Sequence, residues 1–268
     1  MKLGFSTLGC PKWTLEQIAD FAAKNGFDGV ELRTHDDGNH VSPAVGLDEA
    51  ARIGQLFKAR GARIVSLMGY TSFTSEKPEE LAANRDKLIK LADMAAVMGA
   101  KFVRMFVGRL PKGVAHDVIV GRCAGYVSAA CKHASGKGVS IGVETHDDWC
   151  EPAVTMSLVN AVGNGLGVVW DIWNATCFSG RSIDEQYNGL RKAIIYCHVK
   201  DAVKSPDGKH KYVPVGKGEC DIRRAVTLLK NDQPDIFLSF EHEKKWIPEL
   251  AEPEVAFPQY LEYMRKMV

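Results

Sequence analysis

Short runs of β-branched and apolar residues alternate along this chain with longer segments in which apolar residues recur at helical spacing. Eight such runs are short enough, and rich enough in β-branched residues, to predict β-strands. The predicted strands are Lys2–Ser6, Asp28–Arg33, Arg63–Met68, Lys101–Val107, Val139–Glu144, Gly167–Asp171, Ile194–Lys200 and Asp235–Glu241.

Most of the intervening segments predict helices that begin and end at recognisable signals. The first begins at Thr14, where Gln17 three residues later completes a capping box, and it ends at Gly26. The clearest is Pro78–Met98, which opens with Pro-Glu-Glu and stops before a glycine. The other predicted helices are Leu47–Arg60, His116–Lys137, Asp221–Asn231 and Glu254–Met267.

This alternation of strands and helices implies parallel strands joined by helical crossovers. The 268 residues give each of eight units about 33 residues, which is the size range of a single-domain (β/α)₈ TIM barrel of the α/β class. A doubly wound open sheet is the alternative, but no G-x-G-x-x-G follows the first strand. Since the chain shows no linker or break in composition, we predict one domain over residues 1–268.

Composition and charge narrow the classes of function. The net charge of +1 provides no overall field that would recruit nucleic acid or an anionic membrane. No run of ~18 apolar residues is present that could span a membrane. The N-terminal sequence MKLGFSTLGCPKW does not resemble a signal peptide, and the seven cysteines form no CxxC pair. We therefore expect reduced thiols and a cytoplasmic location.

Four of the later predicted strands end in ionisable residues. In a (β/α)₈ barrel the carboxyl ends of the strands surround the active site. Side chains alternate across a strand, so one face of each of these strands points into the barrel. The predicted inner sets are Ser140, Gly142 and Glu144; Gly167, Val169 and Asp171; Ile194, Tyr196, His198 and Lys200; and Phe237, Ser239 and Glu241.

Three carboxylates and a histidine that converge in one opening repel one another and lose hydration, and a bound cation removes that cost. Glu144, Asp171, His198 and Glu241 form an oxygen-rich set, which suits Mn²⁺, Mg²⁺ or Co²⁺ better than a structural zinc site built from cysteine and histidine. The alternative is four separate strand-end charges, each satisfied by a helix N-terminus or an arginine.

At these residues the chain resembles the xylose-isomerase-like TIM-barrel superfamily, the sugar phosphate isomerases and epimerases that include tagatose 3-epimerase and inosose isomerase. The resemblance covers essentially the whole chain. It rests on the order and placement of several short motifs rather than on any one of them. These motifs are GVELR at 29–33, VETHDD at 143–148, WDIWN at 170–174, HVKD at 198–201, GKGECD at 216–221 and SFEHE at 239–243.

The resemblance implies that Glu144, Asp171, His198 and Glu241 are the ligands of one divalent metal ion, with Mn²⁺ as first choice and Mg²⁺, Co²⁺ or Zn²⁺ as alternatives. Glu144 and Glu241 would also serve as the catalytic acid–base pair. The expected reaction is isomerisation or epimerisation of a small keto-sugar or cyclitol through a metal-stabilised enediolate. The resemblance also implies a homodimer or homotetramer.

Further side chains are candidates for contact with the substrate. Lys200 and His146 follow His198 and Glu144 on the inner face, and Arg33 and Arg104 lie near the ends of strands two and four. Glu31 shares the face of Arg33 and is a candidate ion-pair partner for it. Asn174 stands where many members of the superfamily have histidine. Four tryptophans follow strand ends and are expected around the same opening, where they could stack on a sugar or anchor loops; they are Trp13, Trp149, Trp173 and Trp246.

Three other functions use the same residues or the same scaffold. In a metal-dependent dehydratase or lyase, a β-hydroxyl would leave after the same proton abstraction, with Lys200 and His146 as acid candidates. A non-catalytic carbohydrate-binding barrel would not need both glutamates. An endonuclease IV-like repair enzyme would need further histidines after strands three and four, and those segments, SLMGY and MFVGR, contain none.

Overall fold

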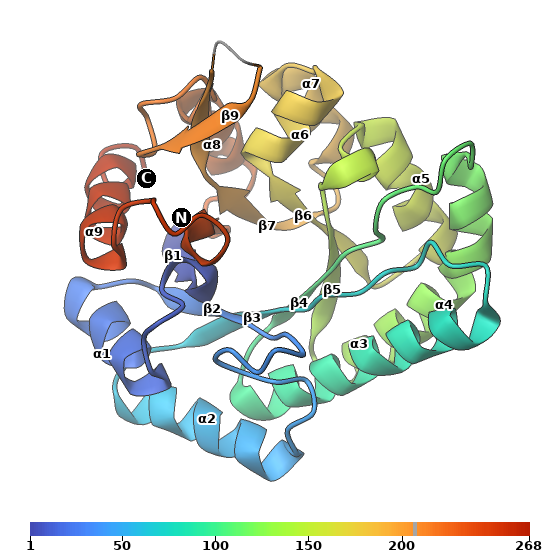
Figure 1. Cartoon of the computed structure of the whole chain (residues 1–268), viewed down its shortest axis with the longest axis horizontal. Coiled ribbons are helices and arrows are strands. Elements are labelled where there is room, and N and C mark those ends of the chain that lie inside the picture. Colours follow the sequence, from blue (N-terminus) through green and yellow to red (C-terminus); the bar gives the residue numbers. More distant parts are fainter. Residues whose placement is uncertain (206–207) are drawn as a thin grey trace.

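The computed structural model describes residues 1–205 and 208–268. Within these residues eight parallel strands close into a barrel in the order β1-β10-β7-β6-β5-β4-β3-β2, with the helices outside it (Figure 1). The prediction of a (β/α)₈ barrel is confirmed, and each predicted strand is present. The strands are β1 (Lys2–Ser6), β2 (Gly29–Arg33), β3 (Ile64–Met68), β4 (Phe102–Met105), β5 (Ser140–Glu144), β6 (Leu166–Asp171), β7 (Ile194–Val199) and β10 (Phe237–Phe240).

The six predicted helices also form, within a few residues of their predicted ends. They are α1 (Leu15–Asn25), α2 (Leu47–Ala59), α3 (Pro78–Met98), α4 (His116–Gly136), α8 (Ile222–Asp232) and α9 (Pro253–Met264). The capping box of α1 is present in both directions, because Thr14 and Gln17 each accept a hydrogen bond from the other's backbone N–H. Gly26 ends the helix with φ of 70°, a conformation that glycine adopts without steric cost.

Three helices were not predicted, and two of them lack a clear helical pattern in the sequence. They are α5 (Pro152–Val162), α6 (Ile172–Ser179) and α7 (Ile183–Leu190). The α5 sequence is apolar on most sides, which hides the spacing of a buried face, and α6 begins directly after β6 without a loop. By contrast, α7 has a capping box at Ser182 and Glu185, a local signal from which this helix could have been predicted.

Two bulges decide which side chains fill the lower part of the barrel. The pairing of β6 with β7 skips Ile195, and the pairing of β2 with β3 skips Val65. Both side chains therefore pack inside the barrel, against the cluster of Val169, Tyr196 and Phe237. The prediction that Ile194 faces inward is wrong, because the bulge moves Ile195 into that place.

After β7 the chain forms an antiparallel hairpin, β8 (Asp201–Lys204) with β9 (His210–Val213), outside the barrel. Asp201 begins the hairpin and is buried. Its two carboxylate oxygens accept four backbone N–H groups, from Ala202, Gly216, Gly218 and Cys220, at 2.9–3.2 Å. This strand-end carboxylate therefore fixes the loop that carries GKGECD, and Gly218 of that motif allows the loop to approach it closely, because a Cβ there would collide with the carboxylate.

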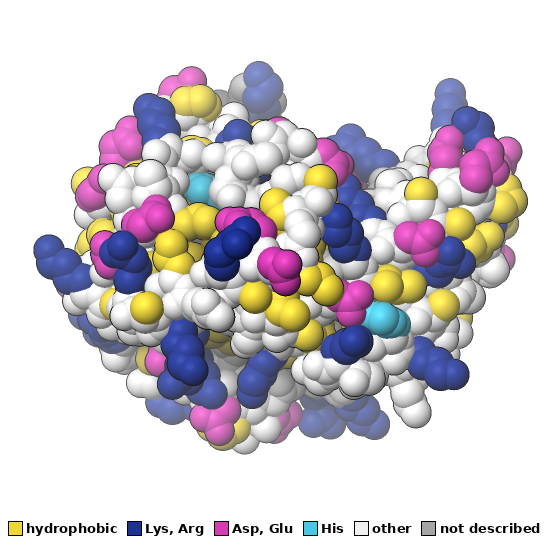
Figure 2. All heavy atoms as spheres, turned by 90° about the horizontal axis from the view of Figure 1, so that it is seen from below, with side chains coloured by type: hydrophobic (Ala, Val, Ile, Leu, Met, Phe, Trp, Pro, Cys, Tyr) yellow, Lys and Arg dark blue, Asp and Glu magenta, His cyan; other side chains and the backbone are white. Residues whose placement is uncertain are grey.

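The surface of the described residues carries charges of both signs. Figure 2 shows lysines and arginines interspersed with aspartates and glutamates over the face that it presents, as the near-neutral net charge leads one to expect. None of the helices in the described parts of the chain combines the length and the apolar character that a membrane crossing requires.

Candidate metal centre

Glu144, Asp171, His198 and Glu241 lie together at the carboxyl end of four neighbouring strands. Glu144 and Asp171 end β5 and β6, His198 is in β7, and Glu241 directly follows β10. Each offers one ligand atom, and these atoms all lie within 4.8 Å of one another. All four side chains are buried. The strand alternation thus brings the predicted ligands into a single cluster that could hold a metal ion.

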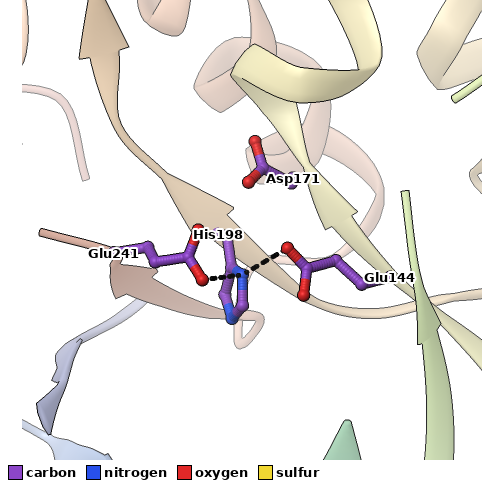
Figure 3. A group of neighbouring side chains, drawn as sticks. All are labelled: Glu144, Asp171, His198 and Glu241. Atoms are coloured by element: carbon purple, nitrogen blue, oxygen red, sulfur yellow. Dashed lines mark hydrogen bonds and ion pairs between the residues drawn. The ribbon is translucent and has the colours of Figure 1, made fainter. Parts of the chain in front are cut away.

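The imidazole of His198 lies between the two glutamates. Its Nδ1 is 3.2 Å from Glu144 Oε1 and 3.4 Å from Glu241 Oε1. Figure 3 shows these glutamates reaching the ring from opposite sides, with Asp171 above the ring in this view. One nitrogen of the imidazole and one oxygen of each glutamate therefore face the same space.

The second nitrogen of His198 is held by Glu31. Glu31 Oε2 accepts from His198 Nε2 at 2.9 Å, and Glu31 is completely buried. The expected Glu31–Arg33 ion pair is wrong, because the carboxylate of Glu31 extends across the barrel interior to His198. Arg33 instead makes a two-pronged ion pair with Asp37 at 2.7 and 3.0 Å.

Two buried cations hold the outer oxygens of the glutamates. Arg104 donates to Glu144 Oε2 at 2.7 Å. Lys200 donates to Glu241 Oε2 at 2.5 Å, and its Nζ also lies 2.7 Å from Asp171 Oδ2 and 3.1 Å from Glu243 Oε1. Each glutamate therefore has one oxygen beside the histidine and the other oxygen beside a cation.

Asp171 has a second role as the N-terminal cap of α6. Its Oδ1 accepts the backbone N–H of Asn174 at 2.8 Å, which leaves Oδ2 for the centre. Asn174 is buried as well, and its side-chain Nδ2 has no hydrogen-bond partner among the described residues. An unpaired buried donor is costly, so this amide is a candidate contact for a bound molecule.

Negative charge exceeds positive charge in this buried region. Five carboxylates face three basic groups, Arg104, Lys200 and His198. The carboxylates are Glu31, Glu144, Asp171, Glu241 and Glu243. With all groups ionised, two negative charges remain uncompensated, which a divalent cation would balance. The donor set of three carboxylates and an imidazole fits such an ion, so the residues present are compatible with the metal that the sequence implies.

The pKa values reflect this crowding. Burial raises the pKa of Asp171 to about 7, in spite of the opposing charge of Lys200. Burial would also raise the pKa of Glu144, but His198 and Arg104 outweigh it and hold that pKa well below its usual range. Burial opposes the charged form of His198, yet Glu31, Glu241 and Glu144 raise its pKa well above the ordinary value. In the protein without metal, protons bound to Asp171 and His198 therefore neutralise part of the negative charge of the carboxylates.

The other predicted substrate contacts differ in how exposed their side chains are and in what they touch. His146 is partly exposed, packs against Phe106 with the ring centroids 4.6 Å apart, and pairs through Nδ1 with Asp147 at 2.9 Å. The Arg33 guanidinium lies 5.2 Å from the ring centroid of Trp246, and half of the Trp246 side chain is exposed. These residues lie near the ends of β5, β2 and β10 and remain candidates for contact with a substrate.

Three of the four tryptophans do not present a free ring. Trp149 is 1% exposed and donates its indole N–H to the Gly108 carbonyl, so its predicted place at the opening is wrong. The Trp13 ring packs against Phe21 of α1 and Phe257 of α9. Trp173 is 6% exposed and contacts rings of α6 and the β8–β9 hairpin. Trp13, Trp149 and Trp173 therefore mainly anchor loops.

A cavity adjoins the centre on the side of β10. Its walls include Lys200, Glu241 and Glu243, and also Tyr212 of the hairpin and Leu250 and Ala251 of the segment before α9. Sequence reasoning missed Glu243, although it lies two residues after Glu241 and alternation would have placed it on the same face. It missed the partner of Glu31 because no local signal identifies a contact across the barrel.

Comparisons with known structures agree with this geometry at the level of the fold. The IolI protein crystallised with a bound zinc atom aligns with a TM-score of 0.81 at 19% identity, covering 100% of this chain and 99% of that one. D-psicose 3-epimerase in the presence of D-fructose aligns with a TM-score of 0.80 at 15% identity, with 100% and 99% covered. The probable 3-DHS dehydratase AsbF of petrobactin synthesis, from Bacillus anthracis, aligns with a TM-score of 0.77 at 18% identity, with 98% and 99% covered.

No curated protein sequence matches the chain significantly. A family model does match, over residues 19–267, which is most of the barrel. The resemblance noted from the short motifs is therefore confirmed, and the chain belongs to the xylose isomerase-like TIM barrel family.

Proposed function

We propose that this protein is a divalent-metal-dependent isomerase or epimerase of a small keto-sugar or cyclitol. One observation carries the proposal: two buried glutamates face each other across a histidine and an aspartate, at the end of the barrel where such enzymes bind their substrates. This arrangement provides both a cation site and two groups that can exchange protons.

Glu144, Asp171, His198 and Glu241 would hold the ion, for which Mn²⁺ is our first choice on the basis of the oxygen-rich donors. When bound, such an ion supplies Lewis-acid chemistry that makes the C–H beside a substrate carbonyl acidic. The protein contributes an enclosed, buried setting that strengthens electrostatic interactions.

The two glutamates have different neighbours, which suggests different roles. Arg104 is always charged and keeps Glu144 ionised, so Glu144 is suited to accept the substrate proton. Lys200 donates a hydrogen bond to one oxygen of Glu241, so the other oxygen of Glu241 is the one suited to return a proton to the other face or the neighbouring carbon. The remaining oxygens of a substrate would meet His146, Asn174 and Arg33, and Trp246 would cover it.

A dehydratase or lyase is the second candidate, and a specific observation favours it. The Lys200 ammonium lies at the centre between Asp171 and Glu241, where it could protonate a leaving hydroxyl. A probable 3-DHS dehydratase is also among the structures with this fold. The two reactions begin with the same proton abstraction and differ in whether water leaves.

The test starts with metal content. The protein is loaded with Mn²⁺, desalted and analysed beside a Glu144→Gln/Glu241→Gln double variant and Glu249→Gln, an exposed glutamate that serves as the control. We expect one ion per chain in the wild type and the control, and loss of the ion in the double variant. No bound ion in folded wild-type protein would refute the proposal.

The reaction is then identified with a panel of keto-sugars and keto-cyclitols in D₂O. An isomerase or epimerase incorporates deuterium at the reacting carbon without changing the product's formula, whereas a dehydratase gives a product lighter by one water. Glu241→Gln should abolish the incorporation, and retained exchange would exclude Glu241 as an essential acid or base.

A further inference from the structure

We infer that Glu31 is the positioning residue of the metal centre: it fixes His198 so that Nε2 carries the proton and Nδ1 is presented to the ion. This inference rests on the proposed metal-dependent function, because it concerns how the protein prepares one of the four ligands. Glu31 touches neither the other three ligands nor the adjoining cavity in any contact among the described residues.

The hydrogen bonds of Glu31 are fully assigned. Its Oε2 accepts from His198 Nε2 and from the Ser239 hydroxyl, both at 2.9 Å, and its Oε1 accepts from the Tyr196 hydroxyl at 2.6 Å. The Tyr196 hydroxyl also lies 3.0 Å from Ser66 Oγ. The donors come from β7 and β10, so both oxygens of this β2 carboxylate are held by neighbouring parts of the barrel.

An ionised carboxylate only accepts hydrogen bonds, so the nitrogen that faces Glu31 must carry a proton. A neutral imidazole has only one such proton, and the other nitrogen then has a free lone pair. That other nitrogen is Nδ1, which points at Glu144 and Glu241. The same contact makes the ring more basic and prevents its rotation, which are the usual effects of a carboxylate behind a metal-binding histidine.

The charge of Glu31 would be expensive if it served only to fill the barrel. Glu31 is completely buried, and burying a carboxylate is costly because the group loses its hydration. The neighbouring layer of the barrel consists of Val169, Tyr196 and Phe237 and holds, among the described residues, no other charged group that Glu31 could pair with. A role in orienting His198 explains why a charge is placed there.

The first experiment uses the full-length wild-type protein labelled with ¹⁵N-histidine and loaded with ¹¹³Cd²⁺. Only a metal-bound ring nitrogen couples to cadmium, and Nδ1 and Nε2 differ in the ring protons with which they correlate. We expect the coupled nitrogen to be Nδ1 and the protonated one to be Nε2. Coupling to Nε2, or no histidine coupling in protein that binds cadmium, would overturn the inference and requires no variant.

The second experiment compares Mn²⁺ affinity by calorimetric titration in wild type, Glu31→Gln and Ser66→Ala. Removing a carboxylate behind a ligating histidine typically weakens metal binding roughly 10- to 100-fold, and we expect that loss in Glu31→Gln. Ser66→Ala removes the far end of the same network but leaves the Glu31–His198 contact, so its affinity should equal that of wild type.

The outcomes separate the two claims. If wild type and Glu31→Gln bind Mn²⁺ equally, the positioning role is wrong and the proposed function stands. If wild type binds no metal, the proposed function itself fails. If both variants lose stability by the same amount without a change in Mn²⁺ affinity, Glu31 serves only the fold, which also overturns the inference.

Discussion

Asp201 allows a direct test of what holds the loop with the GKGECD motif in place at the carboxyl end of the barrel. Its carboxylate is buried and accepts four backbone N–H groups, two on each oxygen. The substitution Asp201→Asn keeps the size and shape but replaces one oxygen by an amide NH₂. Whichever way the amide turns, two backbone N–H groups then face a donor instead of an acceptor.

The expected cost follows from those two lost bonds. A hydrogen bond to a charged acceptor contributes roughly 1.5–3 kcal/mol, so two of them set a range of about 3–6 kcal/mol. Lys217 and Glu219 in the loop are exposed, which allows water to reach part of it and places the expected loss near the lower end, about 3 kcal/mol. Against a typical stability of about 5–15 kcal/mol, this is a large change.

The assay is urea unfolding followed by tryptophan fluorescence, with Asp221→Asn as the matched control. Asp221 caps α8 through a single bond to the Arg224 backbone N–H at 2.9 Å, and asparagine caps helices about as well as aspartate. The control should therefore stay close to wild type. A loss in Asp201→Asn no larger than in Asp221→Asn would show that the four N–H groups do not depend on the charge.

Three further predictions concern titration, buried charge and thiol access. Burial lowers the pKa of His40 to about 4, so protonation of this histidine opposes folding and the free energy of unfolding falls as the pH drops from 6.5 towards 4. In urea unfolding, the stability that wild type loses between neutral pH and pH 5 should be about 2 kcal/mol smaller in His40→Asn. Lys200→Met should destabilise the metal-free protein by about 3–5 kcal/mol, because three carboxylates lose a buried partner. Mn²⁺ should then raise the Tm of the variant more than that of wild type, and an equal shift would contradict the idea that the cation balances excess negative charge. Iodoacetamide should label Cys177 faster than any other cysteine in the native protein, because five cysteines are buried and burial raises the pKa of the Cys220 thiol and so reduces its reactive thiolate. A mass spectrum that shows a buried cysteine labelled as fast as Cys177 would contradict the packing.

Much of the fold was predictable because strand-length apolar runs and helix-ending glycines are local signals. The same local reasoning placed Glu144, Asp171, His198 and Glu241 on the inner face, since alternation depends only on position within each strand. It failed where a bulge shifts that alternation, as at Ile195, and for α6, which starts within the motif that ends β6.

The partners of the site residues were less predictable than the residues themselves. Glu31 and His198 are 167 residues apart, and only the closure of the barrel brings them together. Trp149 has the same sequence setting as a tryptophan at the opening, yet its indole N–H turns inward to Gly108. Sequence pattern specifies the face of a strand, whereas the partner of a side chain depends on the curvature of the whole sheet.

The double role of Asp171 limits how this barrel could evolve away from catalysis. One of its oxygens starts α6 and the other belongs to the charged centre, so most replacements would damage the helix together with the chemistry. Asparagine is the exception, because it still caps a helix but brings no negative charge. A descendant that became a binding protein could therefore lose the charge of the metal centre through this single substitution and keep α6. A descendant under selection for activity would have to retain aspartate at this position.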